Sequence, residues 1–511
     1  MITFMLVLAA IIALYLYGTK TFNYWKNKNV KHDKPVPFFG NNTNNYMMRS
    51  SVTQLAVETY WRYPTERVVG FYRGLRPELV VRDPELVKRI LVTDFASFYP
   101  RGLNPLKEVE PLLRNLFFAD GDLWRLLRQR MTPAFTSGKL KAMFPLIEER
   151  AERLRSRALA AATDRRPVDA RDLMARYTTD FIGACGFGLD SDSLQDENSA
   201  FRKLGATIFN VSAKDVIVAI LKEMFPRIFK NLRVLSRLDT EMMALVNEVL
   251  RQRNYEPTGR NDFIDLMLEC KKKGTITGDS IERVSVDGSP ERATIEMTYE
   301  LIAAQVFVFF AAGFETSSSA TSITLHELAH HPEVQKKIHR EIDTVLAKYE
   351  NKLCYEAIKE MTYLEWAFKE GMRIFPSLGF LVRQCAKRYT FEELNLTIDE
   401  GVKVIIPLQA LHNDPEYFDN PTEFRPERFD PSNSSGRDKF VYLPFGSGPR
   451  ACVGERLGVM QSLAGLAAVL SRVRVQPAPG APRNPRVDTR SNLVQVVRGG
   501  LPLIFTDRRT D

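Results

Sequence analysis

Cysteine and histidine are scarce in this sequence, and this excludes several classes of protein. The 511 residues include five cysteines and six histidines, and no two cysteines stand in a C-x-x-C pair. An odd, scattered set matches neither a disulfide framework nor a zinc-ribbon spacing, so a reducing compartment is expected. Internal repeats and low-complexity tracts are also lacking, and 44% hydrophobic and 26% charged residues indicate an ordinary globular protein.

The sequence has no concentrated block of charge of one sign. Lys and Arg number 71 against 62 Asp and Glu, which gives a net charge of +9. Because the basic residues are scattered, a nucleic-acid partner is not expected. An excess of positive charge instead favours an anionic membrane surface or an acidic protein partner.

The N-terminus carries an apolar run from Ile2 to Tyr17, which predicts a membrane anchor over residues 1–25. Phe22, Tyr24 and Trp25 are expected to extend this anchor as an interfacial belt. Lysines follow the run and none precedes it, so the N-terminus is predicted to be lumenal and the rest cytoplasmic. A cleaved signal peptide is the alternative, but it needs a basic start and a small-residue cleavage site, and neither is evident.

The remaining chain is predicted to be mainly α with a small β portion, an α+β class. Residues 26–40 are basic and proline-rich and predict a hinge, and residues 41–511 are expected to form one catalytic domain. Helical periodicity dominates residues 83–270, and short β-rich runs occur near residues 67–81 and before residue 406. Residues 271–292 are polar and predict a loop. Glu300 to Leu328 predicts one long helix buried through the middle of the protein.

The loop from Pro444 to Gly454 places one cysteine, Cys452, between glycines and just before an apolar helix. A helix N-terminus favours a thiolate, and a thiolate can hold a metal centre such as a haem iron. Alone, Cys452 could equally be a small buried hydrophobe in a turn. The ordered set Phe445, Gly448, Arg450, Cys452 and Gly454 resembles the haem-binding loop of the cytochrome P450 superfamily.

The resemblance implies that haem b lies between the long central helix and the loop and helix at Cys452, with Cys452 as axial iron ligand. It also implies electrons from NADPH through a cytochrome P450 reductase, with cytochrome b5 as a further candidate donor. Three segments resemble insect microsomal detoxification members, which oxidise small apolar compounds such as plant toxins and insecticides at the endoplasmic reticulum membrane. These segments are residues 136–139, 261–266 and 309–316.

The predicted central helix contains Gly313, Glu315 and Thr316. Gly313 weakens the helix, and the Thr316 hydroxyl can bond the carbonyl of Ala312, so a small groove is expected in the helix wall. Glu315 and Thr316 would then pass protons through water to the reacting oxygen. A purely structural role is the alternative. The segment resembles the oxygen-activating element of the same superfamily.

Two further sets of residues are predicted to support the haem. Glu370 and Arg373 stand three apart on one helix face, and Arg428 lies in a Pro-Glu-Arg-Phe segment that resembles the family's second arginine. We expect them to form a buried structural network. The haem propionates need cations and N–H donors. The candidates, from the family's W-x-x-x-R pair and two other segments, are Trp124, Arg128, Arg383 and Arg450.

A competing motif comes from a different class of enzyme. Residues 326–330 spell H-E-x-x-H, in which His326 and His330 would bind zinc and Glu327 would act as general base of a metalloprotease. A third ligand is needed, and Lys336 stands where the extended pattern has a histidine. A distant carboxylate such as Glu341 could complete the site, so the zinc alternative stays open.

The sequence leaves the substrate open. Broad oxidation of xenobiotics and a dedicated step on an endogenous hormone or lipid are both compatible with it, and a haem-thiolate protein without turnover is disfavoured by Glu315 and Thr316. A basic face near the thiolate would suit an acidic reductase. Its candidate residues are Arg125, Arg130, Lys139, Lys141 and Arg456.

Overall fold

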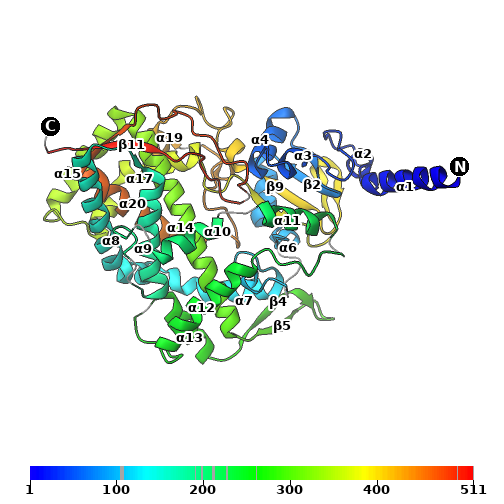
Figure 1. Cartoon of the computed structure of the whole chain (residues 1–511), viewed down its shortest axis with the longest axis horizontal. Helices are drawn as coiled ribbons and strands as arrows, with labels where there is room; N and C mark the ends of the chain where they lie inside the picture. Colours follow the sequence, from blue (N-terminus) through cyan, green and yellow to red (C-terminus); the bar gives the residue numbers. More distant parts are fainter. Residues whose placement is uncertain are drawn as a thin grey trace.

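The fold is organised around one long helix, seen in a computed structural model of the chain (Figure 1). The structure describes residues 1–103, 109–189, 192–196, 199–209, 213–225, 228–260, 262–434, 436–491 and 493–509. Asn261, part of one family-like segment, lies outside these ranges. The central helix, α14, spans Tyr299–His330 and begins where the Thr298 side chain accepts a hydrogen bond from the backbone N–H of Leu301. It ends just before Pro332, which starts the next helix.

Helices surround α14 on most sides, with α9, α17, α20 and α12 among its packing partners. The main helices are α4 (Val52–Arg62), α7 (Gly121–Met131), α8 (Ser137–Asp164), α9 (Ala170–Ile182), α10 (Ala200–Phe209), α11 (Ala213–Met224), α12 (Ser236–Gln252), α13 (Phe263–Lys272), α15 (Pro332–Lys348), α16 (Tyr355–Glu360), α17 (Thr362–Ile374) and α20 (Glu455–Arg472). The expectation of a helix buried through the middle of the protein is confirmed.

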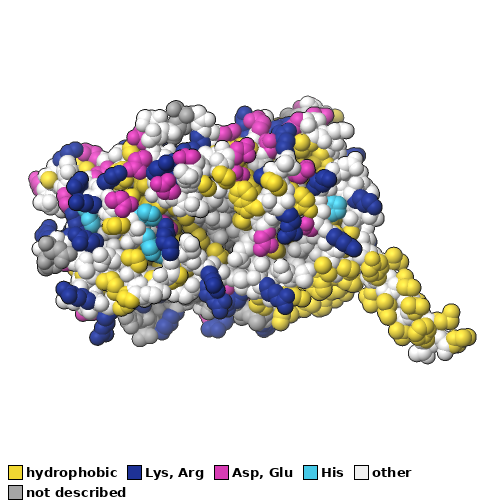
Figure 2. All heavy atoms as spheres, turned by 90° about the horizontal axis from the view of Figure 1, so that it is seen from above, with side chains coloured by type: hydrophobic (Ala, Val, Ile, Leu, Met, Phe, Trp, Pro, Cys, Tyr) yellow, Lys and Arg dark blue, Asp and Glu magenta, His cyan; other side chains and the backbone are white. Residues whose placement is uncertain are grey.

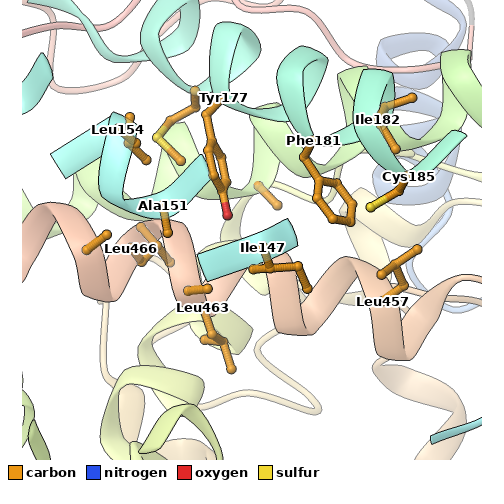
Figure 3. Packing of buried hydrophobic residues seen from close by; sticks show 14 of the residues in the cluster. Ile147, Ala151, Leu154, Tyr177, Phe181, Ile182, Cys185, Leu457, Leu463 and Leu466 are labelled. Carbon is orange, nitrogen blue, oxygen red and sulfur yellow. The ribbon is translucent and has the colours of Figure 1, made fainter. Parts of the chain in front are cut away.

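The core between α8, α9 and α20 shows why these helices pack closely (Figure 3). Tyr177 of α9 points toward α20 between the apolar side chains of α8, and its hydroxyl donates to the carbonyl of Gln461 at 2.8 Å. A Cβ at Gly465 would lie 2.6 Å from the Tyr177 ring, so only glycine allows this approach. Close packing therefore fixes α20, the helix that follows Cys452.

The β portion is small, as predicted. A four-stranded sheet has the order β1 (Val68–Arg73), β2 (Arg76–Val81), β9 (Lys403–Ile406) and β6 (Leu381–Gln384). β1 and β2 are antiparallel, β2 and β9 parallel, and β6 runs antiparallel to β9. Smaller sheets join β10 (Val473–Pro477), β11 (Pro502–Asp507) and β3 (Val168–Asp169), and β7 (Tyr389–Phe391) with β8 (Leu396–Ile398). The fold class is mainly α with a small β portion.

The prediction of a loop over residues 271–292 is wrong. The segment forms an antiparallel hairpin of β4 (Ile276–Val284) and β5 (Pro290–Ile295). The hairpin packs on α7, where the Asp122 carboxylate accepts hydrogen bonds from the Ser280 hydroxyl and the backbone N–H of Ile281. Its polar residues misled the prediction, because an antiparallel hairpin can keep one face in water.

The N-terminal helix α1 (Ile2–Thr19) projects from the body (Figure 1). Its apolar side chains are almost all exposed (Figure 2). By length and composition, α1 and α14 could each cross a membrane. Since α14 is mostly buried inside the protein, α1 is the candidate span.

The residues after α1 pack into the folded body of the protein. Trp25, expected in an interfacial belt, is fully buried, and its indole N–H donates to the carbonyl of Phe71 at 3.1 Å. A Cβ at Gly70 would lie 2.6 Å from the Trp25 ring. The expected hinge is likewise held against β1, because the Gly70 N–H donates to the carbonyl of Lys31 at 2.8 Å. The structural body therefore begins near residue 20.

We predict that Trp25→Ala lowers the free energy of unfolding of the catalytic body by about 3–5 kcal/mol, the cost of emptying a large buried site. Deleting residues 2–19 should leave that stability nearly unchanged. Denaturant unfolding in detergent measures both. The matched control is Trp61→Ala, whose side chain is 40% exposed. Equal losses for Trp25→Ala and Trp61→Ala would show that residue 25 lies outside the cooperative unit.

Candidate functional site

The Cys452 loop is held by close backbone contacts. The Cys452 N–H donates to the carbonyl of Phe445, and the Ala451 N–H to that of Gly448, both at 2.9 Å. Gly446 and Gly448 have φ of +70° and +74°, and a Cβ at Gly448 would lie 1.9 Å from the carbonyl oxygen of Leu91. Glycine is therefore required there. The loop leaves the Cys452 thiol exposed, unlike the buried Cys185, Cys270 and Cys385.

The electrostatics of Cys452 differ from the sequence-based expectation. Burial raises the pKa of the Cys452 thiol above its usual value. The backbone N–H of Gly454 and the guanidinium groups of Arg128 and Arg101 lower that pKa, but burial outweighs them. Although Cys452 is accessible to solvent, the protein around it is dense enough to disfavour the charged thiolate. The helix N-terminus is therefore not the dominant influence on this pKa.

Arg450 joins this loop to α7. Its guanidinium is 3% exposed and donates to the carbonyls of Tyr99 and Ala119, at 2.7 and 2.9 Å, and to the Asp120 carboxylate at 2.8 Å. It lies 4.2 Å from the centre of the Trp124 ring. Arg128, one helical turn beyond Trp124, donates to the carbonyl of Ala451 at 2.8 Å. The structure therefore brings Trp124, Arg128 and Arg450 together beside Cys452.

The half-buried Arg101 and the buried Arg383 complete a cluster of cations. Arg101 donates to the carbonyl of Arg450 at 3.2 Å, and Arg383, on β6, is 1% exposed. Burial and mutual repulsion lower the pKa of Arg450 to about 9 and that of Arg383 well below its usual value. Burial lowers the pKa of Arg101 to about 10. Sequence reasoning missed Arg101, which belongs to no motif and lies in a stretch with other cations.

This cluster fits the two propionates of a haem. Among the described residues, Nη1 of Arg450 and Nε of Arg383 are buried without a hydrogen-bond partner. Buried donors of this kind are costly unless an acceptor meets them. Carboxylates would supply acceptors and also offset the mutual repulsion of the guanidinium groups. The cluster is thus built for a dianionic group next to the exposed thiol.

The middle of α14 carries the predicted groove residues. The Thr316 hydroxyl donates to the carbonyl of Ala312 at 2.6 Å, as the sequence predicted. Ala312 is exposed although most of α14 is buried. A Cβ at Gly313 would lie 2.3 Å from Cδ1 of Ile182, so this glycine also permits close packing against α9. The Ala312–Thr316 turn therefore offers a small apolar surface and one hydroxyl.

Glu315 forms an ion pair that the sequence did not predict. Its carboxylate is 2% exposed and accepts a hydrogen bond from Arg171 of α9 at 2.6 Å. The Arg171 side chain is 29% exposed. Glu315 therefore forms an ion pair with α9. Among the described residues, the Thr316 hydroxyl bonds the carbonyl of Ala312 and not Glu315.

Glu370, Arg373 and Arg428 lie together in the core. Arg373 forms two parallel bonds to the Glu370 carboxylate, at 2.8 and 2.9 Å, and Arg428 donates to it at 3.2 Å. Arg373 also donates to the carbonyl of His412, whose Nε2 accepts from the backbone N–H of Leu443 at 2.9 Å. The network thus reaches the segment that leads into the Cys452 loop.

The H-E-x-x-H motif has a structural explanation. Glu327 accepts two hydrogen bonds from Arg483, at 2.9 and 2.7 Å, and His326 bonds the carbonyl of Arg483 at 3.0 Å. His330 bonds the carbonyl of His326. Over the described parts of the chain, no three His, Cys, Asp or Glu side chains converge on a metal site. The motif therefore fastens α14 to the C-terminal segment, and the zinc alternative has no support here.

Comparison with known proteins decides the family. Residues 31–501 match the family described as Cytochrome P450. The chain belongs to the cytochrome P450 family. It is 36% identical to "Cytochrome P450 6B6" of Helicoverpa armigera, over 98% of this chain and 97% of the relative. It is 37% identical to "Cytochrome P450 6a2" of Drosophila melanogaster, over 92% and 93%, and 34% identical to "Cytochrome P450 6k1" of Blattella germanica, over 97% and 95%.

Membership settles the class of enzyme and the cofactor. Cytochromes P450 are oxidoreductases of the monooxygenase type that use haem b, with electrons from NADPH delivered through a reductase. The α+β fold, with α14 through its centre and an apolar N-terminal helix, agrees with the cytochrome P450 fold. The N-terminal helix is consistent with a membrane-anchored microsomal member.

We predict that Glu370→Gln lowers the free energy of unfolding by about 3–5 kcal/mol, because it leaves the buried Arg373 without its carboxylate and Arg428 with Asp419 alone. Thermal or denaturant unfolding of the haem-loaded protein measures this. Glu248→Gln is a matched control, since Glu248 and Arg251 have the same spacing in an exposed helix pair. That control should not measurably change stability. A loss no larger than that of the control would contradict a supporting role for the network.

Proposed function

We propose that this cytochrome P450 inserts one oxygen atom from O2 into small lipophilic molecules at the endoplasmic reticulum membrane. The observation that carries the proposal is the exposed Cys452 beside a cluster of arginines in which Arg383 and Arg450 are buried. Cys452 is the proposed axial iron ligand. The proposed propionate donors are Arg101, Trp124, Arg128, Arg383 and Arg450. Glu370, Arg373 and Arg428 are proposed to be structural.

The haem would supply the redox centre at which O2 and two electrons react. Thr316 is the proposed catalytic hydroxyl, because it lies on the exposed turn of α14 and can exchange protons with water. Glu315 is proposed to take part through its ion pair with the partly exposed Arg171, which connects the buried carboxylate toward solvent. In balance, the substrate, O2, two electrons and two protons give the hydroxylated product and water.

The substrates proposed are xenobiotics such as plant toxins and insecticides, on the resemblance of the chain to insect members of the family. A dedicated step on an endogenous hormone or lipid is the competing assignment. Turnover of many unrelated apolar compounds by the reconstituted enzyme would support the first. Turnover of a single compound at low concentration, with the others inert, would overturn it in favour of the second.

The proposed arrangement at the membrane has α1 (Ile2–Thr19) as anchor, a lumenal N-terminus and the catalytic body on the cytoplasmic side. An NADPH-cytochrome P450 reductase is the proposed electron donor, with cytochrome b5 as a second donor. Arg125, Arg130 and Lys139 are the proposed contacts. Lys141 and Arg456, which bond Glu356 and Ser137, are further candidates on the same proposed face.

We predict that Cys452→Ala abolishes the carbon monoxide difference band typical of a haem-thiolate, because the axial sulfur is lost. Reduced protein treated with carbon monoxide provides the measurement. Cys354→Ala serves as the control, since this half-buried cysteine caps the N-terminus of α16 and lies outside the Cys452 loop. It should leave the band unchanged. A normal band in Cys452→Ala would remove Cys452 as the ligand.

A further inference from the structure

A serine outside the predicted site holds the backbone of the Thr316 turn. Ser377 lies in the segment between α17 and β6, and its hydroxyl donates to the carbonyl of Thr316 at 2.9 Å. The Thr316 hydroxyl in turn donates to the carbonyl of Ala312 at 2.6 Å. Both the hydroxyl and the carbonyl of Thr316 are therefore hydrogen-bonded. The hydroxyl bonds its own helix, and the carbonyl bonds a residue more than sixty positions later in the chain.

Ser377 is itself fixed by a buried glutamine from the C-terminal part of the chain. Gln495 is 3% exposed, and its backbone N–H donates to the carbonyl of Ser377 at 2.8 Å. Its side-chain amide donates to the carbonyl of Pro376 at 2.8 Å and to Oε1 of Gln409 at 2.9 Å. Gln409 donates to the carbonyl of Ile374 at 2.8 Å. The 374–377 segment is thus held by hydrogen bonds to three of its four carbonyls.

A donor from outside a helix alters the turn that it bonds. A carbonyl oxygen in a helix normally accepts from the N–H four residues on, here Ala320, and a second donor shares that oxygen. A side chain inserted in this way bends or opens the local turn. The Thr316 carbonyl lies one turn before Ala320. The hydrogen bond from the Ser377 hydroxyl to this carbonyl therefore sets the distance between the Thr316 backbone and the 374–377 segment.

We propose that Ser377 is a positioning residue for Thr316, and that Gln495 fixes Ser377 for this purpose. The inference rests on the proposed role of Thr316. With Thr316 in place, two electrons and two protons give product and water from substrate and O2. With Thr316 displaced, the same two electrons and two protons convert O2 to H2O2, and the substrate is left unchanged. Ser377 therefore governs the share of electrons that reaches product.

The experiment compares Ser377→Ala, Ser377→Thr and Thr316→Ala in the full-length, haem-loaded enzyme with its reductase. The first measurement is the share of NADPH electrons recovered in H2O2 and in product. The second is hydrogen–deuterium exchange over residues 312–320, which reports opening of the turn without turnover. Ser377→Ala should raise the H2O2 share several-fold and speed exchange, and Ser377→Thr, which keeps the hydroxyl, should restore both.

Ser471→Ala is the matched control, because Ser471 also donates its hydroxyl to a helix carbonyl, that of Ala468, but at the far end of α20. It should change neither measurement. Gln495→Ala is the second variant if Ser377→Ala loses haem, and it should shift both measurements in the same direction. Unchanged H2O2 and exchange in the Ser377 and Gln495 variants, with leakage in Thr316→Ala, would overturn this inference alone. Absence of leakage in Thr316→Ala would overturn the proposed role of Thr316.

Discussion

The seating of Arg450 is the constraint on which the site depends. Its guanidinium stacks on Trp124 and donates hydrogen bonds to the carbonyls of Tyr99 and Ala119. The Cys452 loop, α7 and the chain before α7 therefore meet at one buried cation. Burying a charge in this way is costly unless hydrogen bonds and an opposite charge accompany it. Asp120 supplies one such charge. The neighbouring Arg101 and Arg383 add cations without adding acids, and this imbalance is what makes the cluster suited to haem carboxylates.

A second buried network supports the loop from behind. Glu370 gathers Arg373 and Arg428, and Arg373 reaches the carbonyl of His412. Burial and the nearby Arg373 lower the pKa of His412 to about 3, so its ring stays neutral and can accept from the Leu443 N–H. A neutral imidazole thus links an ion cluster to the backbone three residues before Gly446. The two networks hold the loop at its entry and at its exit.

The sequence predicted best what is local. The Cys452 loop needs glycines at fixed positions, and Trp124 and Arg128 share one helix face. The Thr316 hydroxyl bonds the carbonyl four residues back. Each of these features depends only on residues within a short segment of the sequence. Contacts across long separations were not predictable. Arg101 joins the cation cluster and Arg171 pairs with Glu315 only through the tertiary fold, and Trp25 was misassigned because an aromatic after an apolar helix also suits a membrane interface. The 276–295 hairpin was missed because its polar residues concealed strand pairing.

We propose that the Cys452 sulfur and the arginine cluster hold one haem. X-ray absorption at the iron edge of the purified, haem-loaded protein tests the first half of this claim most directly, since it identifies the atoms bound to iron. The account predicts one sulfur ligand in addition to the four porphyrin nitrogens, and its loss in Cys452→Ser. A spectrum with nitrogen and oxygen ligands alone in the native protein would contradict it.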